Sequence, residues 1–105
     1  MKEVSVDELK EMLDNGEDFQ LVDVREPNEF EICSLGGDEI PMSQIMTRYT
    51  EISKEKKVVV HCKSGRRSAN VIQALEQHFG YQNLYNLDGG ILEWAQEIDP
   101  EMDQY

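Results

Sequence analysis

Short β-branched segments alternate with helical ones along this chain, and the alternation limits its fold more than any other feature. The clearest unit is Lys57–His61, which contains three consecutive valines and leads through one loop to a helical pattern ending near Phe79. Strands that are apolar throughout are typical of parallel sheets buried on both faces. The repeated strand and helix order therefore predicts an α/β fold, with a central parallel sheet and helices on both faces.

Helix caps, apolar spacing and turn residues predict the other elements. Ser5 and Glu8 form a capping-box pattern, so the first element is expected to be a helix that ends at Asn15-Gly16. Ser68 is expected to cap the helix after the cysteine loop, and Gly80 to end it. The remaining expected elements are strands at 19–24, 38–41 and 83–87, a short helix beginning at Pro27, and helices at 43–52 and 91–98.

The composition excludes several classes of protein. A chain of 105 residues with 39% hydrophobic and 30% charged residues is typical of one globular domain, so residues 1–105 are expected to form a single unit. The 22 acidic residues outnumber the 10 basic ones, which argues against nucleic acid and anionic membranes as partners. No apolar run could span a bilayer and residues 1–8 are too polar for a signal peptide, so a cytoplasmic protein is expected.

The cysteines and histidines are few and widely spaced. Cys33 and Cys62 do not suggest a disulfide framework and are expected to be free thiols. His61 and His78 do not complete a zinc-binding spacing, so no metal is expected. His61 is expected to serve in packing, because neighbouring residues of a strand point to opposite faces. Cys33 is expected to be inert.

The loop after His61 carries the strongest chemical signal. It reads C-K-S-G-R-R-S, which brings three basic residues close to the thiol of Cys62. Free N–H groups at a helix N-terminus, together with these cations, favour the thiolate over the thiol. Cys62 is therefore predicted to be a catalytic nucleophile, although a buried structural cysteine is the alternative. The residues predicted to bind an anionic substrate are Lys63, Ser64, Gly65, Arg66, Arg67 and Ser68.

Several separated motifs resemble the rhodanese homology domain over nearly the whole chain. Leu21–Phe30 matches its D-x-R-x-x-x-E-[FY] segment, Ile40-Pro41 its short strand end, 62–68 its C-x-x-G-x-R-S loop, and Leu87–Trp94 its L-x-G-G-x-x-x-W ending. The segment E-I-C-S-L-G-G after the first motif departs from the usual G-H-I-x-G-A. In this it resembles the rhodanese domains fused to MoeB/ThiF-like adenylyltransferases. The resemblance implies a rhodanese-like fold.

The same resemblance implies a rhodanese-type sulfurtransferase. Such an enzyme would move sulfane sulfur from thiosulfate or a protein persulfide to a thiol, cyanide or a sulfur carrier, through a Cys62 persulfide. The implied partners are a small anionic sulfur donor or a persulfide protein, and a ubiquitin-like sulfur carrier; no cofactor is implied. Asp23 and Arg25 match the first motif and are expected to be structural residues near the site, as a buried ion pair.

Two other functions are compatible with this fold. Cysteine phosphatases and arsenate reductases resemble this chain at His61-Cys62, but they carry arginine six positions after the cysteine. Here that position is Ser68, and Arg67 lies five positions after the cysteine. The shorter loop resembles that of sulfur-transferring members of the fold. A regulatory binding module without turnover is the third possibility, against which the intact cysteine and the basic loop both argue.

Overall fold

The computed structural model describes residues 1–105 and contains one parallel sheet of five strands, in the order β1-β5-β4-β2-β3. The strands are β1 (Glu3–Val4), β2 (Phe19–Asp23), β3 (Asp38–Glu39), β4 (Lys57–His61) and β5 (Leu84–Leu87). The helices are α1 (Val6–Asp14), α2 (Pro27–Phe30), α3 (Ile45–Arg48), α4 (Arg66–Phe79) and α5 (Gly90–Glu97), with 3₁₀ turns η1 (Met42–Gln44) and η2 (Tyr49–Glu51) on either side of α3. The predicted α/β fold with a central parallel sheet is confirmed.

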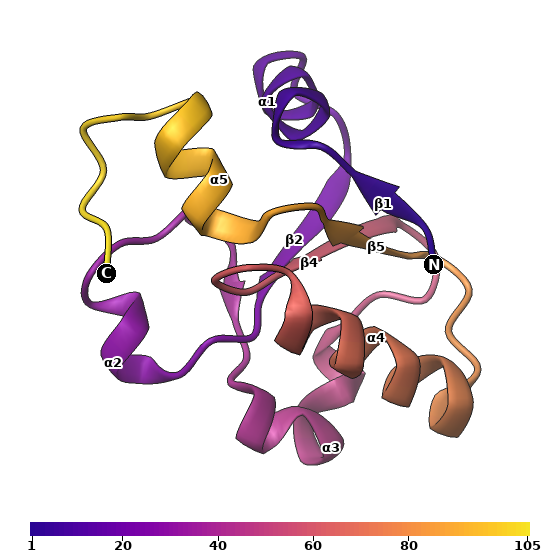
Figure 1. The fold of residues 1–105 in the computed structure, drawn as a ribbon. Helices are drawn as coiled ribbons and strands as arrows, with labels where there is room; N and C mark the ends of the chain where they lie inside the picture. Colours follow the sequence, from indigo (N-terminus) through magenta and orange to yellow (C-terminus); the bar gives the residue numbers. More distant parts are fainter.

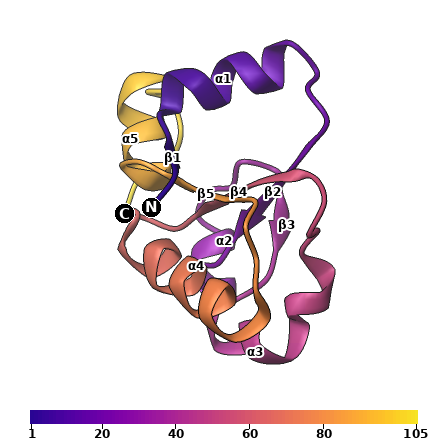
Figure 2. The same ribbon diagram turned by 90° about the vertical axis from the view of Figure 1, so that its right-hand side faces the viewer.

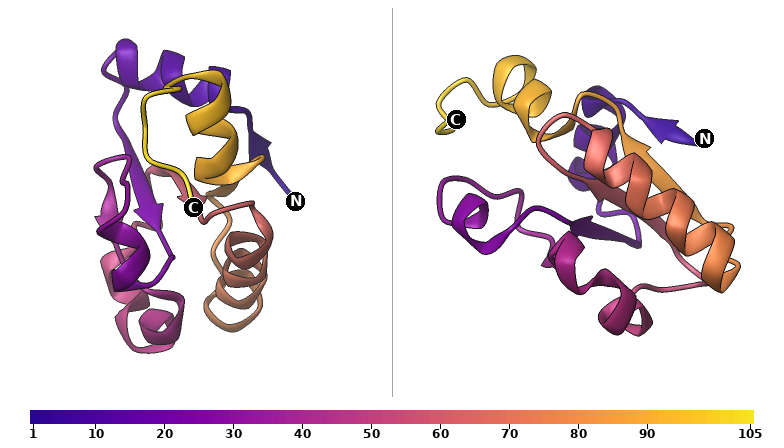
Figure 3. Two further views of the ribbon diagram at one scale, coloured as in Figure 1. Left: turned by 60° about the vertical axis from the view of Figure 1, so that its left-hand side comes forward. Right: turned by 60° about the horizontal axis from the view of Figure 1, so that its bottom comes forward.

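Helices cover both faces of the sheet. Figures 1 and 2 show α1 and α5 on one side, and α3 and α4 on the other. The segment after α5 returns to the end of the sheet where α2 lies (Figures 1 and 3). The longest helix, α4, has 14 residues, and none of the helices combines the length with the apolar character that a membrane span requires.

Strand β4 joins the two halves of the core. Val58 and Val60 belong to the hydrophobic cluster on the α4 side, whereas Val59 belongs to the cluster beneath α1 and α5. This alternation follows from the two-residue period of a strand. All three valines are fully buried. The run of valines therefore fits a strand covered on both faces, as the sequence predicts.

The helix ends test the predicted caps. The capping box at the start of α1 is present, because Ser5 Oγ accepts from the Glu8 N–H and Glu8 Oε1 accepts from the Ser5 N–H, each at 3.1 Å. Gly80 ends α4 with a left-handed φ of 69°, as expected. The prediction that Ser68 caps α4 is wrong. Gly65 turns the chain with a φ of 99°, so α4 begins at Arg66 and Ser68 is buried in its first turn.

Two further elements differ from the prediction. The sequence predicts no strand before α1, but Glu3–Val4 forms β1 by pairing with Asn86 and Leu87 of β5. Two residues are too few to show a strand pattern, so only the neighbouring strand defines β1. The helix predicted at 43–52 is divided into η1, α3 and η2. Thr47, Tyr49 and Thr50 are poor helix formers, which is consistent with this division.

Candidate active site

Cys62 lies in the short loop between β4 and α4, at the carboxyl end of the sheet. Its Sγ atom lies 3.1 Å from the Gly65 backbone nitrogen and 3.4 Å from both the backbone nitrogen and the Oγ atom of Ser68. The residue is only 1% exposed. The loop and the first turn of α4 thus form a compact cradle of N–H groups around one sulfur atom.

These N–H groups decide the ionisation of the thiol. Burial raises the pKa of Cys62, because it penalises the thiolate. The backbone N–H groups of Ser68, Gly65 and Ser64 donate hydrogen bonds to the sulfur and oppose this effect, and the pKa of Cys62 lies below its ordinary value. The cradle therefore favours an anionic sulfur at this position, which is the electrostatic setting of a reactive cysteine.

The start of α5 holds the loop from the other side. The backbone N–H of Ile91 donates to the Cys62 carbonyl and that of Leu92 to the Lys63 carbonyl, both at 3.0 Å. Gly90 makes this approach possible, since a Cβ atom there would lie 2.7 Å from the Cys62 carbonyl oxygen and against the Lys63 carbonyl. Gly90, the first residue of α5, thus does more than turn the chain, because it allows α5 to pack against the cysteine loop.

The three cations of the loop do not bind the sulfur. Arg67 forms two hydrogen bonds with the Glu29 carboxylate, at 2.6 and 2.8 Å. The Lys63 ammonium lies 4.4 Å from the centroid of the Tyr105 ring. The side chains of Arg66 and Ser64 are exposed to solvent. The predicted loop residues are therefore gathered around Cys62, but backbone N–H groups rather than cations contact Sγ.

Asp23 and Arg25 form the predicted buried ion pair at the end of β2. Arg25 Nη2 lies 2.7 Å from Asp23 Oδ2, and the Arg25 side chain is fully buried. Arg25 also donates to the carbonyl oxygens of Glu29 and Cys33 and to the Tyr105 hydroxyl. The guanidinium therefore fastens α2, the segment after it and the C-terminal tyrosine to the end of the sheet, without contacting Cys62.

His61 and Cys33 occupy positions consistent with packing. His61 is fully buried, neither of its ring nitrogens makes a hydrogen bond, and Nε2 lies 3.8 Å from Asp23 Oδ2. Burial lowers the pKa of His61, which keeps the ring neutral at physiological pH. Cys33 is half-buried, and its sulfur lies 3.7 Å from a guanidinium nitrogen of Arg25. Neither residue contacts the Cys62 thiol.

The sequence motifs assign no site role to three residues of this region: Glu29, which the first motif contains, Asn86 and Tyr105. The Glu29 carboxylate accepts hydrogen bonds from the Arg67 guanidinium and from the Tyr105 hydroxyl, whose oxygen lies 2.6 Å from Glu29 Oε2. Asn86, in β5, contacts both the carbonyl of Gly65 and the hydroxyl of Ser68. Asn86 pairs with Val60 in the strand register. Its place just before the Leu87 to Gly90 turn is the one sequence signal that could have indicated it.

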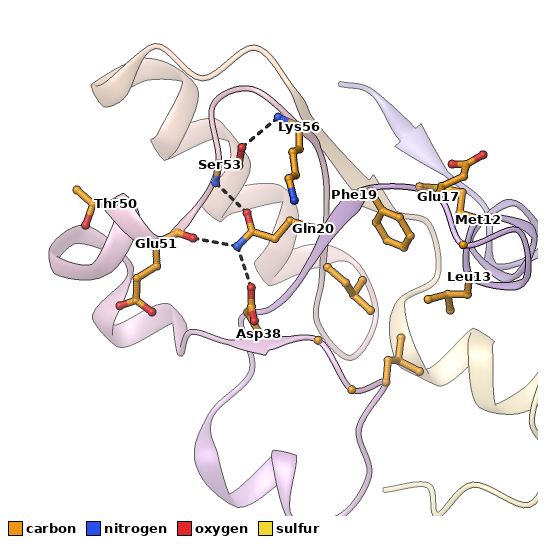
Figure 4. Close-up of a pocket in the computed structure, with 15 residues that line it drawn as sticks. Met12, Leu13, Glu17, Phe19, Gln20, Asp38, Thr50, Glu51, Ser53 and Lys56 are labelled. Atoms are coloured by element: carbon orange, nitrogen blue, oxygen red, sulfur yellow. Dashed lines mark hydrogen bonds between the residues drawn. The ribbon is translucent and has the colours of Figure 1, made fainter.

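The largest groove of the protein lies elsewhere. It has a volume of about 690 Å³ and lies between α1, β2 and the η2 segment. In Figure 4 the side chain of Gln20 joins its polar residues, donating to Asp38 and to the Glu51 carbonyl and accepting from the Ser53 N–H, at 2.8 to 2.9 Å. These polar groups satisfy one another, and neither cysteine lines the groove. The groove therefore lies apart from the Cys62 loop.

Comparison with known proteins agrees with this geometry. The family model of the rhodanese-like domain matches residues 5–97. The "Probable adenylyltransferase/sulfurtransferase MoeZ" of Mycobacterium tuberculosis is 35% identical over 101 residues, which cover 93% of this chain and 26% of MoeZ. This chain therefore spans about a quarter of that protein. A sulfurtransferase of Allochromatium vinosum is 38% identical over 96 residues, which cover 90% of this chain and 89% of that protein.

A solved structure supports the same assignment of the fold. The rhodanese-like domain protein from Staphylococcus aureus superposes with a TM-score of 0.82 and 32% sequence identity. The alignment covers 93% of this chain and 95% of the other. The predicted rhodanese-like fold, with helices on both faces of a parallel sheet, is confirmed by this likeness.

Proposed function

Because the chain belongs to the rhodanese-like family, we propose that it is a sulfurtransferase that carries sulfane sulfur as a persulfide on Cys62. The observation that carries the proposal is the cradle of N–H groups from Gly65 and Ser68 around Sγ. Such donors stabilise anionic sulfur without needing to move during the reaction. We treat residues 1–105 as one catalytic unit, because both hydrophobic clusters share one sheet.

The reaction has two steps. The Cys62 thiolate attacks the outer sulfur of thiosulfate or of a protein persulfide; its bond to that sulfur forms, the donor S–S bond breaks, and sulfite or the donor thiolate leaves with the electron pair. An acceptor thiolate or cyanide then attacks the outer sulfur of the Cys62 persulfide. This releases Cys62 as a thiolate. Neither step changes the number of electrons in the system, so no external oxidant or reductant is needed.

The loop residues have distinct roles in this scheme. Gly65 and Ser68 donate N–H groups to the sulfur, while Lys63 and Arg66 attract an anionic donor or the C-terminal end of a carrier protein. Ser64 adds a further backbone N–H. Arg67 holds the loop against α2 through Glu29. The acceptor class we propose includes a ubiquitin-like sulfur carrier, since MoeZ joins a sulfurtransferase to an adenylyltransferase in its name.

The position of Arg67 favours sulfur over phosphate chemistry. A cysteine phosphatase needs an arginine that binds the phosphate above the nucleophile. Here the guanidinium of Arg67 forms two hydrogen bonds with the Glu29 carboxylate of α2, so an acidic group already occupies the donors that would bind a phosphate. No other arginine follows in the loop. The ion pair of Arg67 and Glu29 therefore favours sulfur transfer over phosphatase chemistry, as the length of the loop also does.

Intact mass measurement tests the proposal. Incubation with thiosulfate or with a persulfide donor should add one sulfur atom, about 32 Da, and cyanide should remove it. Cys62→Ser should abolish the adduct, whereas the matched variant Cys33→Ser should retain it. Absence of the adduct with both donors, on folded protein, would overturn the sulfurtransferase assignment. Hydrolysis of an aryl phosphate that depends on Cys62 would instead indicate a phosphatase, and binding without turnover a regulatory module.

A further inference from the structure

Asn86 lies beside the cysteine loop, although it does not touch the sulfur. It is 5% exposed and projects from β5, the strand next to β4. Its Nδ2 donates to the Gly65 carbonyl at 3.0 Å, and its Oδ1 accepts from the Ser68 hydroxyl at 2.6 Å. A carbonyl oxygen only accepts, so the amide nitrogen must face Gly65 and the amide oxygen must face Ser68. The orientation of the amide is thereby fixed.

This orientation determines where the Ser68 proton points. A hydroxyl has one proton to donate, and the amide oxygen of Asn86 can only accept. The Ser68 hydroxyl therefore donates its proton in the hydrogen bond to Asn86 Oδ1, with 2.6 Å between the two oxygens. The Ser68 Oγ atom therefore presents lone pairs to Cys62 Sγ, 3.4 Å away. A protonated thiol donates to these lone pairs, whereas a thiolate receives nothing from them. The contact between Ser68 and Cys62 thus favours the neutral thiol.

We propose that Asn86 is a positioning residue that sets the protonation of Cys62 through two opposed contacts. Its amide nitrogen fixes the Gly65 peptide, whose N–H donates to the thiolate. Its amide oxygen draws the Ser68 proton away from the thiolate. The inference rests on the proposed role of Cys62 as the nucleophile, and it places the stabilisation of the anion on the backbone N–H groups of Gly65 and Ser68.

The charged groups around Cys62 do not depend on Asn86. On the α4 side, Arg67 is paired with Glu29 of α2. On the loop itself, Lys63 faces the Tyr105 ring. Behind the loop, the neutral His61 lies next to the ion pair of Asp23 and Arg25 at the end of β2. The α5 side approaches through backbone N–H groups at Ile91 and Leu92. Substitution of Asn86 therefore changes hydrogen bonds near the thiol and leaves these charges in place.

A double-mutant cycle on Asn86 and Ser68 tests the inference. The variants are Asn86→Leu, which keeps a similar side-chain shape without polar atoms, Ser68→Ala, and the two combined. The readout is the pH dependence of Cys62 alkylation by iodoacetamide, followed on the Cys62 peptide by mass spectrometry so that Cys33 does not contribute. In the wild-type background, Ser68→Ala should not move the alkylation midpoint to higher pH.

In the Asn86→Leu background the Ser68 hydroxyl is free to donate to the thiolate. Adding Ser68→Ala to that background should reduce the thiolate fraction about tenfold at a pH below the midpoint, the usual scale of a hydrogen bond to a charged group. Any loosening of the Gly65 turn by Asn86→Leu is common to both variants and cancels. A loss of thiolate on Ser68→Ala that is equal in the two backgrounds would overturn the inference.

Two features keep the test decisive. If Asn86→Leu fails to fold, Ser68→Ala alone still answers the question, because a midpoint moved to higher pH in that variant shows that the hydroxyl donates to the thiolate. Alanine is also a better helix former than serine, so α4 should tolerate it. Alkylation needs no sulfur donor, so failure of sulfur transfer and failure of the Asn86 inference give different results.

Discussion

Replacement of Asp23 by asparagine should destabilise this protein strongly, because the fully buried Arg25 guanidinium cannot replace the lost hydrogen bonds with bonds to water. Every N–H of the buried guanidinium is already used: Nε and Nη2 donate to Asp23, while Nη1 and Nη2 also reach the carbonyls of Glu29 and Cys33 and the Tyr105 hydroxyl. Asp23→Asn removes the only carboxylate bonded to Arg25. The substitution also places the NH₂ group of the new amide against the Arg25 guanidinium, which can only donate hydrogen bonds.

The expected loss is large for a chain of this size. Removing one partner of a buried ion pair costs about 3 to 5 kcal/mol, because the remaining charge is left uncompensated. At roughly 4 to 8 °C per kcal/mol, a loss of about 4 kcal/mol lowers Tm by about 15 to 30 °C. The matched control is Asp14→Asn, the same change in the exposed pair with Lys10. That pair lies on the surface, so its loss should cost less than about 1 kcal/mol.

Chemical denaturation with urea, together with a thermal melt followed by circular dichroism, measures both variants. A third variant, Asp23→Leu with Arg25→Met, removes the whole charge pair and should recover part of the loss seen with Asp23→Asn. If Asp23→Asn costs no more than Asp14→Asn, the buried pair does not hold the end of β2 as described. If the double variant is no more stable than Arg25→Met alone, which loses the same hydrogen bonds to Glu29 and Cys33 but leaves Asp23 charged, an uncompensated charge is not the cause of the loss.

Three further outcomes are expected. Arg67 lowers the pKa of Glu29 from 4.5 to about 2, so the stability that the ionised Glu29 adds is complete above pH 4.5 and is lost as the pH falls toward 2. Glu29→Gln should therefore flatten the fall of Tm between pH 4.5 and pH 2. An unchanged slope would contradict the assigned role of Glu29. Gly90→Ala should distort the loop and reduce persulfide formation on Cys62 in the mass assay, because Gly90 has a left-handed φ of 62° and its Cβ would press on the Lys63 carbonyl; an active, equally stable variant would refute this. Alkylation of Cys62 should have its midpoint below that of an ordinary thiol, and a midpoint at or above that of a model thiol would show that burial prevails.

The elements that carry local signals could be predicted from the sequence. The valine run of β4, the capping box of α1 and the Gly80 terminator of α4 each depend on neighbours in the chain, and each is present. Strand β1 has only two residues and exists through its pairing with β5, so no local pattern indicates it. Ser68 has the residue type of a cap, but the turn at Gly65 starts the helix before it.

The candidate site divides in the same way. The motif around Cys62 can be read in the sequence because one loop contains it. The partners of its cations cannot, since Arg67 meets Glu29 across 38 positions and Tyr105 lies 76 positions beyond Glu29. Proximity in sequence therefore suggests that the cations act on the thiol. In the folded protein, however, Arg67 pairs with the carboxylate of Glu29, which is distant in sequence but lies next to it in space. The contact with sulfur is made by the backbone N–H groups of Gly65 and Ser68, in line with the prediction that free N–H groups at the helix N-terminus favour the thiolate.

The alternation of the β4 valines between two cores has a consequence for how the protein opens. Val58 and Val60 tie the strand to one cluster and Val59 ties it to the other, so β4 cannot separate from either side without disturbing both. Its amides should therefore exchange with solvent deuterium only through global unfolding. Cys62 follows directly on this strand. In the proposed reaction, the motion that admits a sulfur donor must therefore come from the surrounding segments, while the strand that carries Cys62 stays fixed.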